Sequence, residues 1–216
     1  MASLGLKYLE TPKLTVAEQI ALDKELMLEV GRGGKTPLLR FYDLTDEAVV
    51  LGLSQEEEKY VDTEETKKDG VPVIRRFSGG GTVFLTRGCV VYSVIAPIKP
   101  PFRRFDVMGA YKTTFAPVIE AFQKQGLALE FHEPCDLAIG GRKVAGSAQS
   151  QRGGAVIIHG SFLVDPDLTR IVRYLKEPDV RPLYRAERSH EDFLLPLAQL
   201  GFTDQTLREL LIQAWC

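Results

Sequence analysis

Strand-like and helix-like patterns come in separate blocks along this chain of 216 residues, and this order limits the fold more than any other feature. After a first helical pattern at residues 15–31, short β-like runs lie within residues 38–53 and 71–96, on either side of an acid-rich stretch. A second helical pattern at 106–125 precedes β-rich segments at 127–164, and helical patterns return after residue 165. Because segregated blocks favour antiparallel or mixed sheets, we predict an α+β fold with a largely antiparallel or mixed sheet flanked by helices.

Local signals predict where the helices begin and end. Thr15 and Glu18 form a capping-box pattern at the start of the first helix, and Gly31 can end it. The acid-rich stretch at residues 56–69 predicts one solvated helix. From residue 165 onward three amphipathic helices are predicted, the last beginning near Thr203, and we expect them to form a small C-terminal appendage.

Composition excludes several classes of function. The chain has 27 Lys+Arg against 29 Asp+Glu, whereas a dedicated nucleic-acid binder needs an excess of basic residues. The longest apolar run, residues 90–98, is far shorter than the roughly 20 residues that span a bilayer. The N-terminus has no secretory pattern, so a cytoplasmic location is expected. Three cysteines without CxxC spacing predict neither disulfides nor a metal site.

The first candidate for chemistry is RRFSGGGTVF at residues 75–84, where two arginines precede three glycines between two strand-like runs. Standard phosphate-loop, dinucleotide, zinc-protease and nucleophile-elbow signatures are absent. Consecutive glycines allow backbone amides to face a ligand, and arginine adds bidentate charge, so the pattern suits phosphate or carboxylate oxygens. A glycine-rich hairpin without function is the alternative.

The second candidate is CDLAIGGRKVAGSAQ at residues 135–149. Strand alternation sends Arg142 and Lys143 to opposite faces, so one of them must point inward or into a cleft. A lysine among small residues can stabilise developing oxyanion charge. Two solvated cations on an edge strand are the alternative.

Two further side chains have a structural and a chemical interpretation. His159 lies in an apolar strand-like run, where a histidine is usually a packed, hydrogen-bonded core residue. Cys135 is a candidate nucleophile if a base lies beside it.

At these clusters the chain resembles the lipoate–protein ligase and octanoyltransferase superfamily, which is related to biotin protein ligases. Residues 75–84 resemble its glycine loop, and residues 135–149 resemble its Asn-Asp followed by Gly-Arg-Lys-Val-Ser-Gly. IIHGSFLV at residues 157–164 resembles its His-Gly-Thr/Ser strand, and the helix from Thr15 fits its opening helix. The resemblance spans residues 15–175 in the family's order. It implies the biotin/lipoate ligase catalytic-domain fold.

The resemblance implies a role for individual residues. Lys143 falls on the family's active-site lysine and would contact the acyl carbonyl and the phosphate of an acyl-adenylate. Nucleotide and substrate binding would involve Arg75, Arg76, Ser78, Gly79, Gly80, Gly81, Thr82, Val83, Phe84, Asp136, Gly146, Ser147, Ala148 and His159.

The implied activity is that of a lipoate–protein ligase. Lipoate or octanoate and ATP, with Mg²⁺, would give an acyl-adenylate, and a lysine of a lipoyl carrier domain would then accept the acyl group. The carrier would belong to a 2-oxoacid dehydrogenase, a glycine cleavage H protein or a similar protein. Residues 1–216 would form a single catalytic domain, with residues 165–216 as its helical C-terminal part. The accessory C-terminal ligase domain is expected to be absent, which suggests a small partner subunit.

Two departures from the family pattern keep alternatives open. Cys135-Asp136 replaces Asn-Asp, and Leu85-Thr86 replaces the His-Asp that often follows the glycine loop. The main alternative is an octanoyl or lipoyl transferase that moves the acyl group between carrier proteins through a cysteine thioester. A biotin ligase fits less well because the Gly-Arg-Gly-Arg loop is missing. A non-catalytic acyl-binding protein would not need Lys143.

Overall fold

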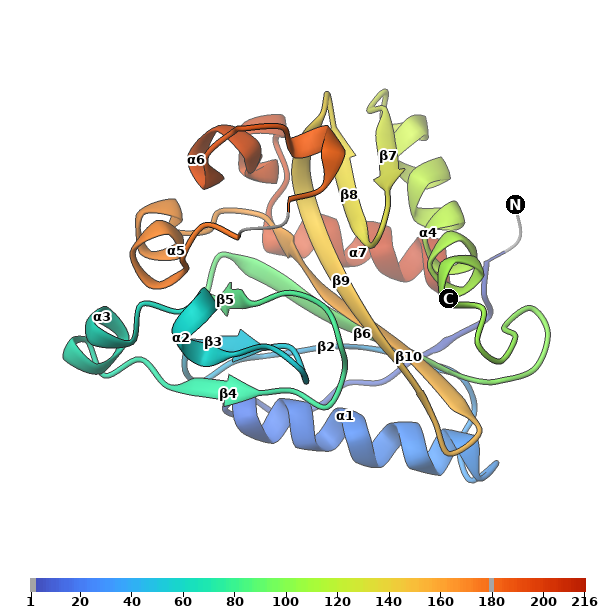
Figure 1. Ribbon diagram of the computed structural model, residues 1–216. Helices are drawn as coiled ribbons and strands as arrows, with labels where there is room; N and C mark the ends of the chain where they lie inside the picture. The colour runs from blue at the N-terminus through green and yellow to red at the C-terminus, as the bar shows by residue number, and fades with distance from the viewer. Residues whose placement is uncertain (1–2, 179–180) are drawn as a thin grey trace.

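The computed structural model describes residues 3–178 and 181–216, and their strands form two sheets (Figure 1). In spatial order, the seven-stranded sheet contains β1 (Lys7–Tyr8), β2 (Leu38–Phe41), β6 (Cys89–Pro97), β10 (Ala155–Leu163), β9 (Arg142–Arg152), β8 (Asp136–Ile139) and β7 (Leu129–His132). The three-stranded sheet contains β4 (Val73–Arg75), β3 (Ala48–Leu51) and β5 (Val83–Leu85). Strand pairs in the larger sheet are antiparallel except β1 with β2. The α+β class with a mostly antiparallel sheet is therefore confirmed, with two sheets where one was expected.

Helices cover both faces of the larger sheet (Figure 1). The α-helices are α1 (Val16–Gly31), α2 (Glu57–Tyr60), α3 (Thr63–Lys68), α4 (Val107–Lys124), α5 (Leu168–Tyr174), α6 (His190–Phe193) and α7 (Asp204–Trp215). Two short 3₁₀ turns are η1 (Leu183–Arg185) and η2 (Leu197–Leu200). Helix α1 begins with the predicted capping box between Thr15 and Glu18.

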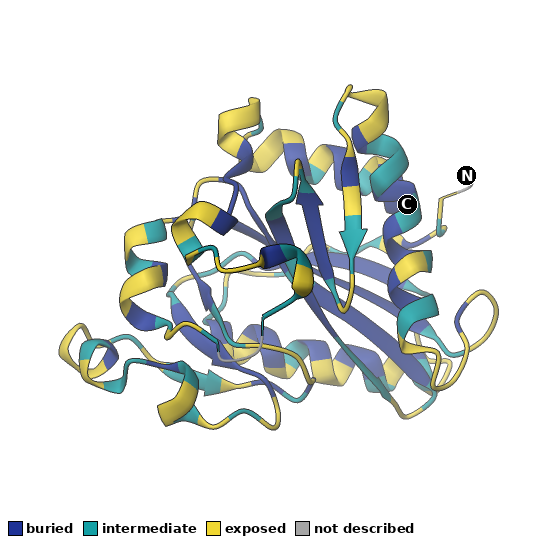
Figure 2. Cartoon of the chain, turned by 45° about the horizontal axis from the view of Figure 1, so that its top comes forward, coloured by how far each residue is buried: buried dark blue, intermediate teal, exposed yellow. Residues whose placement is uncertain are grey.

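Strand β6 shows how the sheet separates two apolar layers. Val90, Tyr92 and Val94 point into the core beneath α4 and α7, whereas Val91 and Ile95 point to the opposite face with α1 and the smaller sheet. Because successive side chains of a strand alternate between faces, a strand buried on both sides reads as a continuous apolar run. In Figure 2 the central strands are buried and the exposed residues lie mainly on the helices and loops.

The glycine-rich segment is a crossover connection. Strand β3 pairs in parallel with β4 on one side and antiparallel with β5 on the other. The chain between β4 and β5 therefore passes across an end of β3, and these two strands are not paired with each other. This excludes the hairpin interpretation of residues 75–84.

The acidic stretch at residues 56–69 contains two short helices instead of the single one expected. Val61, between α2 and α3, has extended dihedrals and is fully buried. It forms a β-bridge with Leu175 just after α5. Burial of this apolar side chain against a distant segment overrides the local helical pattern.

The C-terminal helix is part of the main core, which differs from the expected appendage. Leu207, Leu211 and Trp215 of α7 are fully buried in the same apolar cluster as α4. The Trp215 indole Nε1 donates to the Thr114 carbonyl at 2.7 Å, and its ring lies 5.0 Å from that of Tyr92. No helix in the described part of the chain has both the length and the apolar character needed to cross a bilayer.

We expect Trp215→Ala to lower the free energy of unfolding by about 3–5 kcal/mol, because it removes a buried aromatic ring and leaves a cavity. Urea unfolding followed by circular dichroism measures this change. Phe105→Ala is the control, since this ring is 84% exposed and surface substitutions change stability by about 0.5 kcal/mol or less. An equally small effect of Trp215→Ala would show that α7 does not belong to the folded core.

Candidate active site

A bulge between β8 and β9 aims Lys143 into the site. The two strands form a hairpin through a Gly140-Gly141 turn, and their register shifts between Leu137 and Ala138. Leu137 pairs with Ala145 but Ala138 pairs with Lys143, so Val144 is an extra residue on β9. Val144 and Ala145 both lie in the main apolar core. A bulge of this kind re-aims the neighbouring side chain, which places Lys143 on the opposite face.

Lys143 is held over Gly146 by a carboxylate. Its Nζ lies 2.7 Å from Asp136 Oδ1, and the Lys143 side chain is 24% exposed. A Cβ at residue 146 would lie only 2.7 Å from Nζ, so glycine provides the room that the ammonium group needs. Burial alone would lower the pKa of Lys143, but the Asp136 carboxylate outweighs it and raises the pKa above its usual value. Lys143 is therefore an ammonium group at neutral pH, and the interpretation as a solvated cation is wrong.

Arg76 holds the glycine loop together. It is 6% exposed, and its Nη2 donates to the carbonyls of Gly79 at 2.6 Å and Gly81 at 2.8 Å. Gly80 adopts a φ of +89°, and a Cβ there would lie 2.9 Å from Arg76 Nη2. Burial lowers the pKa of Arg76 to about 10, which leaves it charged at neutral pH. Arg75 is likewise engaged with backbone carbonyls, including that of Gly52 at 3.0 Å. Both arginines therefore bind backbone carbonyls, where the sequence suggested bidentate contact with a ligand.

A buried chain of hydrogen bonds fixes the loop to the sheet and to α1. Ser78 Oγ accepts from Arg76 Nε at 3.0 Å and lies 2.6 Å from His159 Nε2. The other ring nitrogen, Nδ1, lies 3.1 Å from Asp23 Oδ2. If Ser78 donates to Nε2, then Nδ1 carries the proton and donates to Asp23, which satisfies every partner.

This Ser–His–Asp arrangement resembles that of a hydrolase, but its burial argues against a nucleophilic role. Ser78 is 1% exposed and Asp23 is fully buried. Asp23 Oδ1 also pairs with Arg40 at 2.6 Å, while Oδ2 accepts from Tyr42 and Ser93. Burial alone would raise the pKa of Asp23, but hydrogen bonds from His159 and Ser93 and the charge of Arg40 lower it. The group anchors the loop to the core, which agrees with the structural interpretation of His159, while the binding role implied for His159 by the resemblance stays a prediction.

Two cavities meet at Lys143. The smaller, of about 110 Å³, lies between the glycine loop and the larger sheet and has an apolar part lined by Ile20, Val50, Leu85 and Val91. The larger, of about 660 Å³, lies beneath the described residues between Leu168 and Leu195, which we call the C-terminal segment. The residues that line both cavities are Gly81, Thr82, Val83, Cys135, Asp136, Lys143, Gly146 and Ser161.

Most of the residues singled out from the sequence gather here. Those that line the smaller cavity are Arg76, Gly81, Thr82, Val83, Asp136, Lys143, Gly146, Ser147, Ala148 and His159. Phe84 lines only the larger cavity. Arg75, Ser78, Gly79 and Gly80 line neither of the two cavities: Ser78 is buried, whereas Arg75, Gly79 and Gly80 are exposed.

Sequence reasoning missed the contribution of the C-terminal segment. The larger cavity is also lined by Lys176, Arg181, Arg185 and His190, four residues that can carry positive charge. The closeness of these basic residues in the sequence was the signal that could have pointed to an anion-binding surface. Asp23 lies in the opening helix and was given no role of its own, although a carboxylate on a buried helix face points to a partner within the core.

Comparison with known proteins identifies the family. A sequence profile described as "Lipoyl protein ligase A/B catalytic domain" matches residues 15–214. The chain belongs to the lipoyl protein ligase A/B family.

Relatives in this family include both ligases and transferases. A probable lipoate-protein ligase A of Mycoplasma pneumoniae is 32% identical over 167 residues, which cover 77% of this chain but only 48% of that protein. The octanoyltransferase LipM of Macrococcus caseolyticus is 27% identical, covering 93% of this chain and 80% of that protein. This chain thus spans about half the length of the Mycoplasma ligase.

The fold also matches a solved member of the lipoyl protein ligase A/B family. The structure describes a bi-partite lipoate protein ligase and its E2 lipoyl domain from Thermoplasma acidophilum, and it superposes with a TM-score of 0.78. Sequence identity is 27%, and the match covers 99% of this chain and 82% of the other.

We expect Asp23→Asn to lower the free energy of unfolding at pH 7 by about 3 kcal/mol or more, because it leaves Arg40 buried without its counter-ion. The lowered pKa means that ionised Asp23 stabilises the fold fully above its unfolded pKa of about 4. That stabilisation is lost as the pH falls through the lower folded pKa. The difference between wild type and variant should therefore shrink in acid.

Urea unfolding from pH 7 down to the acid range tests this expectation. Asp69→Asn is the matched control, because Asp69 pairs with the partly exposed Arg173 at 3.0 Å and such pairs contribute about 1 kcal/mol or less. A difference between wild type and Asp23→Asn that is small, or that does not change with pH, contradicts the assignment.

Proposed function

We propose that this protein is an ATP-dependent lipoate–protein ligase acting as a single catalytic domain in the cytoplasm. In the first step an oxygen of the lipoate or octanoate carboxylate attacks the α-phosphorus of ATP, and pyrophosphate leaves. In the second step the ε-amine of a carrier lysine attacks the acyl carbonyl of the adenylate, and AMP leaves. The products are an amide on the carrier, AMP and pyrophosphate.

The observation that carries this proposal is the position of Lys143 where the two cavities meet. An acyl chain suits the smaller cavity with its apolar part, and a nucleotide suits the larger one with its basic lining. A mixed anhydride that occupies both would place its carbonyl and phosphate oxygens beside the Lys143 ammonium group. Because the adenylate is already activated, positioning and charge stabilisation can supply most of the rate enhancement.

The residues present fit a nucleotide better than a metal held by the protein. Lys143, Arg181 and Arg185 offer positive charge to a polyphosphate. No group of three or more His, Cys, Asp or Glu side chains suited to a metal occurs among residues 3–178 and 181–216. Both Asp136 oxygens are already engaged, one by Lys143 and one by Tyr184. Mg²⁺ would therefore arrive on the nucleotide phosphates, which is its usual mode of binding in such sites.

The acceptor in this proposal is a lipoyl carrier domain, of a 2-oxoacid dehydrogenase, a glycine cleavage H protein or a similar protein. The Thermoplasma structure pairs a ligase with its E2 lipoyl domain, and that ligase is bi-partite. A small accessory subunit is accordingly part of the proposal for the adenylation step.

The test is an intact-mass assay of a lipoyl domain incubated with this protein, lipoate and Mg·ATP, with a control lacking ATP. A mass gain of one lipoyl group that requires ATP supports the ligase. A gain with octanoyl-carrier protein but without ATP contradicts it and supports acyl transfer. Adding chemically prepared lipoyl-adenylate tests the second step alone, which separates a missing accessory subunit from an inactive site.

We expect Lys143→Ala to slow the ATP-dependent modification by about 10²–10³-fold, because the variant loses the cation that stabilises the developing oxyanion. Initial rates by intact mass give the measurement. Lys112→Ala is the control, since this exposed lysine on α4 pairs with Glu133 at 3.4 Å. Retention of wild-type activity by Lys143→Ala would remove the catalytic assignment.

Thioester transfer through Cys135 is the second candidate. Cys135 lines both cavities, and LipM octanoyltransferases are among the relatives. Burial and the neighbouring Asp136 raise the pKa of the Cys135 thiol, while Lys143 and Arg76 offset only part of that rise. Since the thiolate is the nucleophile, a raised pKa disfavours this role. The described residues place no hydrogen-bonding base on its sulfur.

We expect Cys135→Ser to retain ligation within about threefold, since the adenylate route needs no nucleophilic thiol. The same intact-mass assay measures it, with Cys216→Ser as a control at an exposed thiol. Complete loss of acyl transfer in Cys135→Ser, with Cys216→Ser active, supports the transferase in place of the ligase.

A further inference from the structure

The second oxygen of Asp136 is occupied by a residue from the C-terminal segment. While Asp136 Oδ1 lies 2.7 Å from Lys143 Nζ, its Oδ2 accepts a hydrogen bond from the Tyr184 hydroxyl at 2.9 Å. Asp136 is 4% exposed, so these two groups are its polar environment on the cavity side. Tyr184 belongs to η1, more than 40 residues after Asp136 in the sequence.

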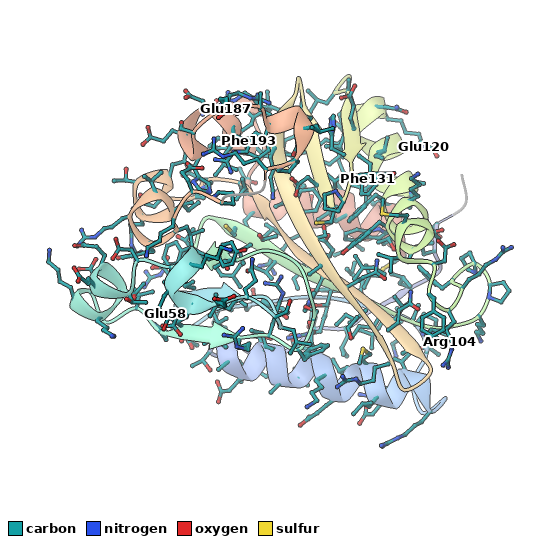
Figure 3. The ribbon with its side chains drawn as sticks, in the orientation of Figure 1. Glu58, Arg104, Glu120, Phe131, Glu187 and Phe193 are labelled. Carbon is teal, nitrogen blue, oxygen red and sulfur yellow. The ribbon has the colours of Figure 1, made fainter. Side chains whose placement is uncertain are left out.

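The ring of Tyr184 is clamped, which fixes its hydroxyl. It stacks on His132 of β7 with ring centroids 4.0 Å apart and an interplanar angle of 17°. On another side it lies 5.2 Å from the ring of Phe193. Figure 3 shows Phe193 near the end of the sheet where β9 begins. Because the two ring contacts already fix the side chain, its hydroxyl loses little conformational entropy when it binds its acceptor.

The segment that carries Tyr184 is bonded to the strand that carries Lys143. The Leu195 amide donates to the Lys143 carbonyl at 2.8 Å, and Arg142 Nη2 donates to the Leu194 carbonyl at 2.6 Å. Lys143 and Leu194 also form a parallel β-bridge. The lysine, its carboxylate and the tyrosine are therefore parts of one hydrogen-bonded unit.

We propose that Tyr184 is a positioning residue for Lys143, acting through Asp136. This proposal rests on the proposed catalytic role of Lys143. The Tyr184 hydroxyl donates to Oδ2, which stabilises negative charge on that oxygen and leaves Oδ1 to pair with Lys143. An ammonium group has three donors, and Lys143 then keeps protons available for the acyl and phosphate oxygens. Without the hydroxyl, the carboxylate can turn both oxygens to Lys143 and bind it more tightly.

Other charged or titratable groups also face Lys143. Cys135 precedes β8, Arg185 lies in η1, and His190 begins α6, and each interacts electrostatically with this lysine. The Arg185 guanidinium and His190 Nδ1 both contact the carboxylate of Glu177. Neither contacts Asp136 by a hydrogen bond in the described chain, so Tyr184 is the group through which the C-terminal segment reaches the carboxylate.

Tyr184→Phe removes the hydroxyl and keeps the stacked ring. We expect the reactivity of Lys143 toward acetic anhydride at fixed pH, measured by peptide mass spectrometry, to fall about fivefold, as expected for a carboxylate that binds the ammonium group more tightly. In the ligation assay kcat should fall by a similar factor with an unchanged KM for lipoate. The labelling uses the protein without substrates, so it tests the positioning role even where the ligase proposal fails.

Two further variants distinguish a positioning role of Tyr184 from a general loss of stability. Tyr174→Phe removes a similar hydrogen bond, from a tyrosine to Asp69 at 2.7 Å, and should leave Lys143 labelling unchanged. In an Asp136→Asn background, Tyr184→Phe should have no further effect, because the pathway through the carboxylate is gone. Wild-type labelling in Tyr184→Phe, an equal effect of Tyr174→Phe, or a full effect in the Asp136→Asn background would each overturn the proposal.

Discussion

The structure depends on one buried carboxylate, that of Asp23. Its two oxygens connect α1 with β2 through Arg40, with β6 through Ser93 and with β10 through His159. A charge buried this deeply is stable only if every lone pair has a partner, and that requirement fixes the distance between α1 and the larger sheet. His159 then passes the constraint to Ser78. The glycine loop is thereby hydrogen-bonded to the buried network around Asp23.

The glycines near the site serve the placement of charges. At Gly146 the absent Cβ makes room for the Lys143 ammonium group, and at Gly80 it makes room for the Arg76 guanidinium. Lys143 lines both cavities. Arg76 instead donates to the carbonyls of its own loop. The two basic clusters that look alike in the sequence are therefore used differently: Arg76 holds the glycine loop together, and Lys143 lines both cavities.

The sequence predicted what depends on local patterns. The capping box at Thr15 and the two long helices follow from side-chain spacing, and the apolar run of β6 predicts a strand. The inward turn of Lys143 was predicted as one of two options, and only the bulge at Val144 decides between them. Val61 and Trp215 were misjudged because burial against segments more than 100 residues away is invisible to a local pattern. Tyr184, 48 residues after Asp136, lies outside any motif built on residues 75–164.

The C-terminal segment lines the larger cavity of a fold whose relatives include both ligases and transferases. In either proposed reaction, Lys143 and the smaller cavity would serve the attack on an acyl carbonyl, whatever group leaves. The difference lies in what stands beside the carbonyl: basic side chains for a nucleotide, or an ionised thiol for a thioester. Here Arg181 and Arg185 line the larger cavity, while burial raises the pKa of Cys135 and keeps the thiol protonated. This difference is the reason that we propose activation by a nucleotide in place of capture by a cysteine.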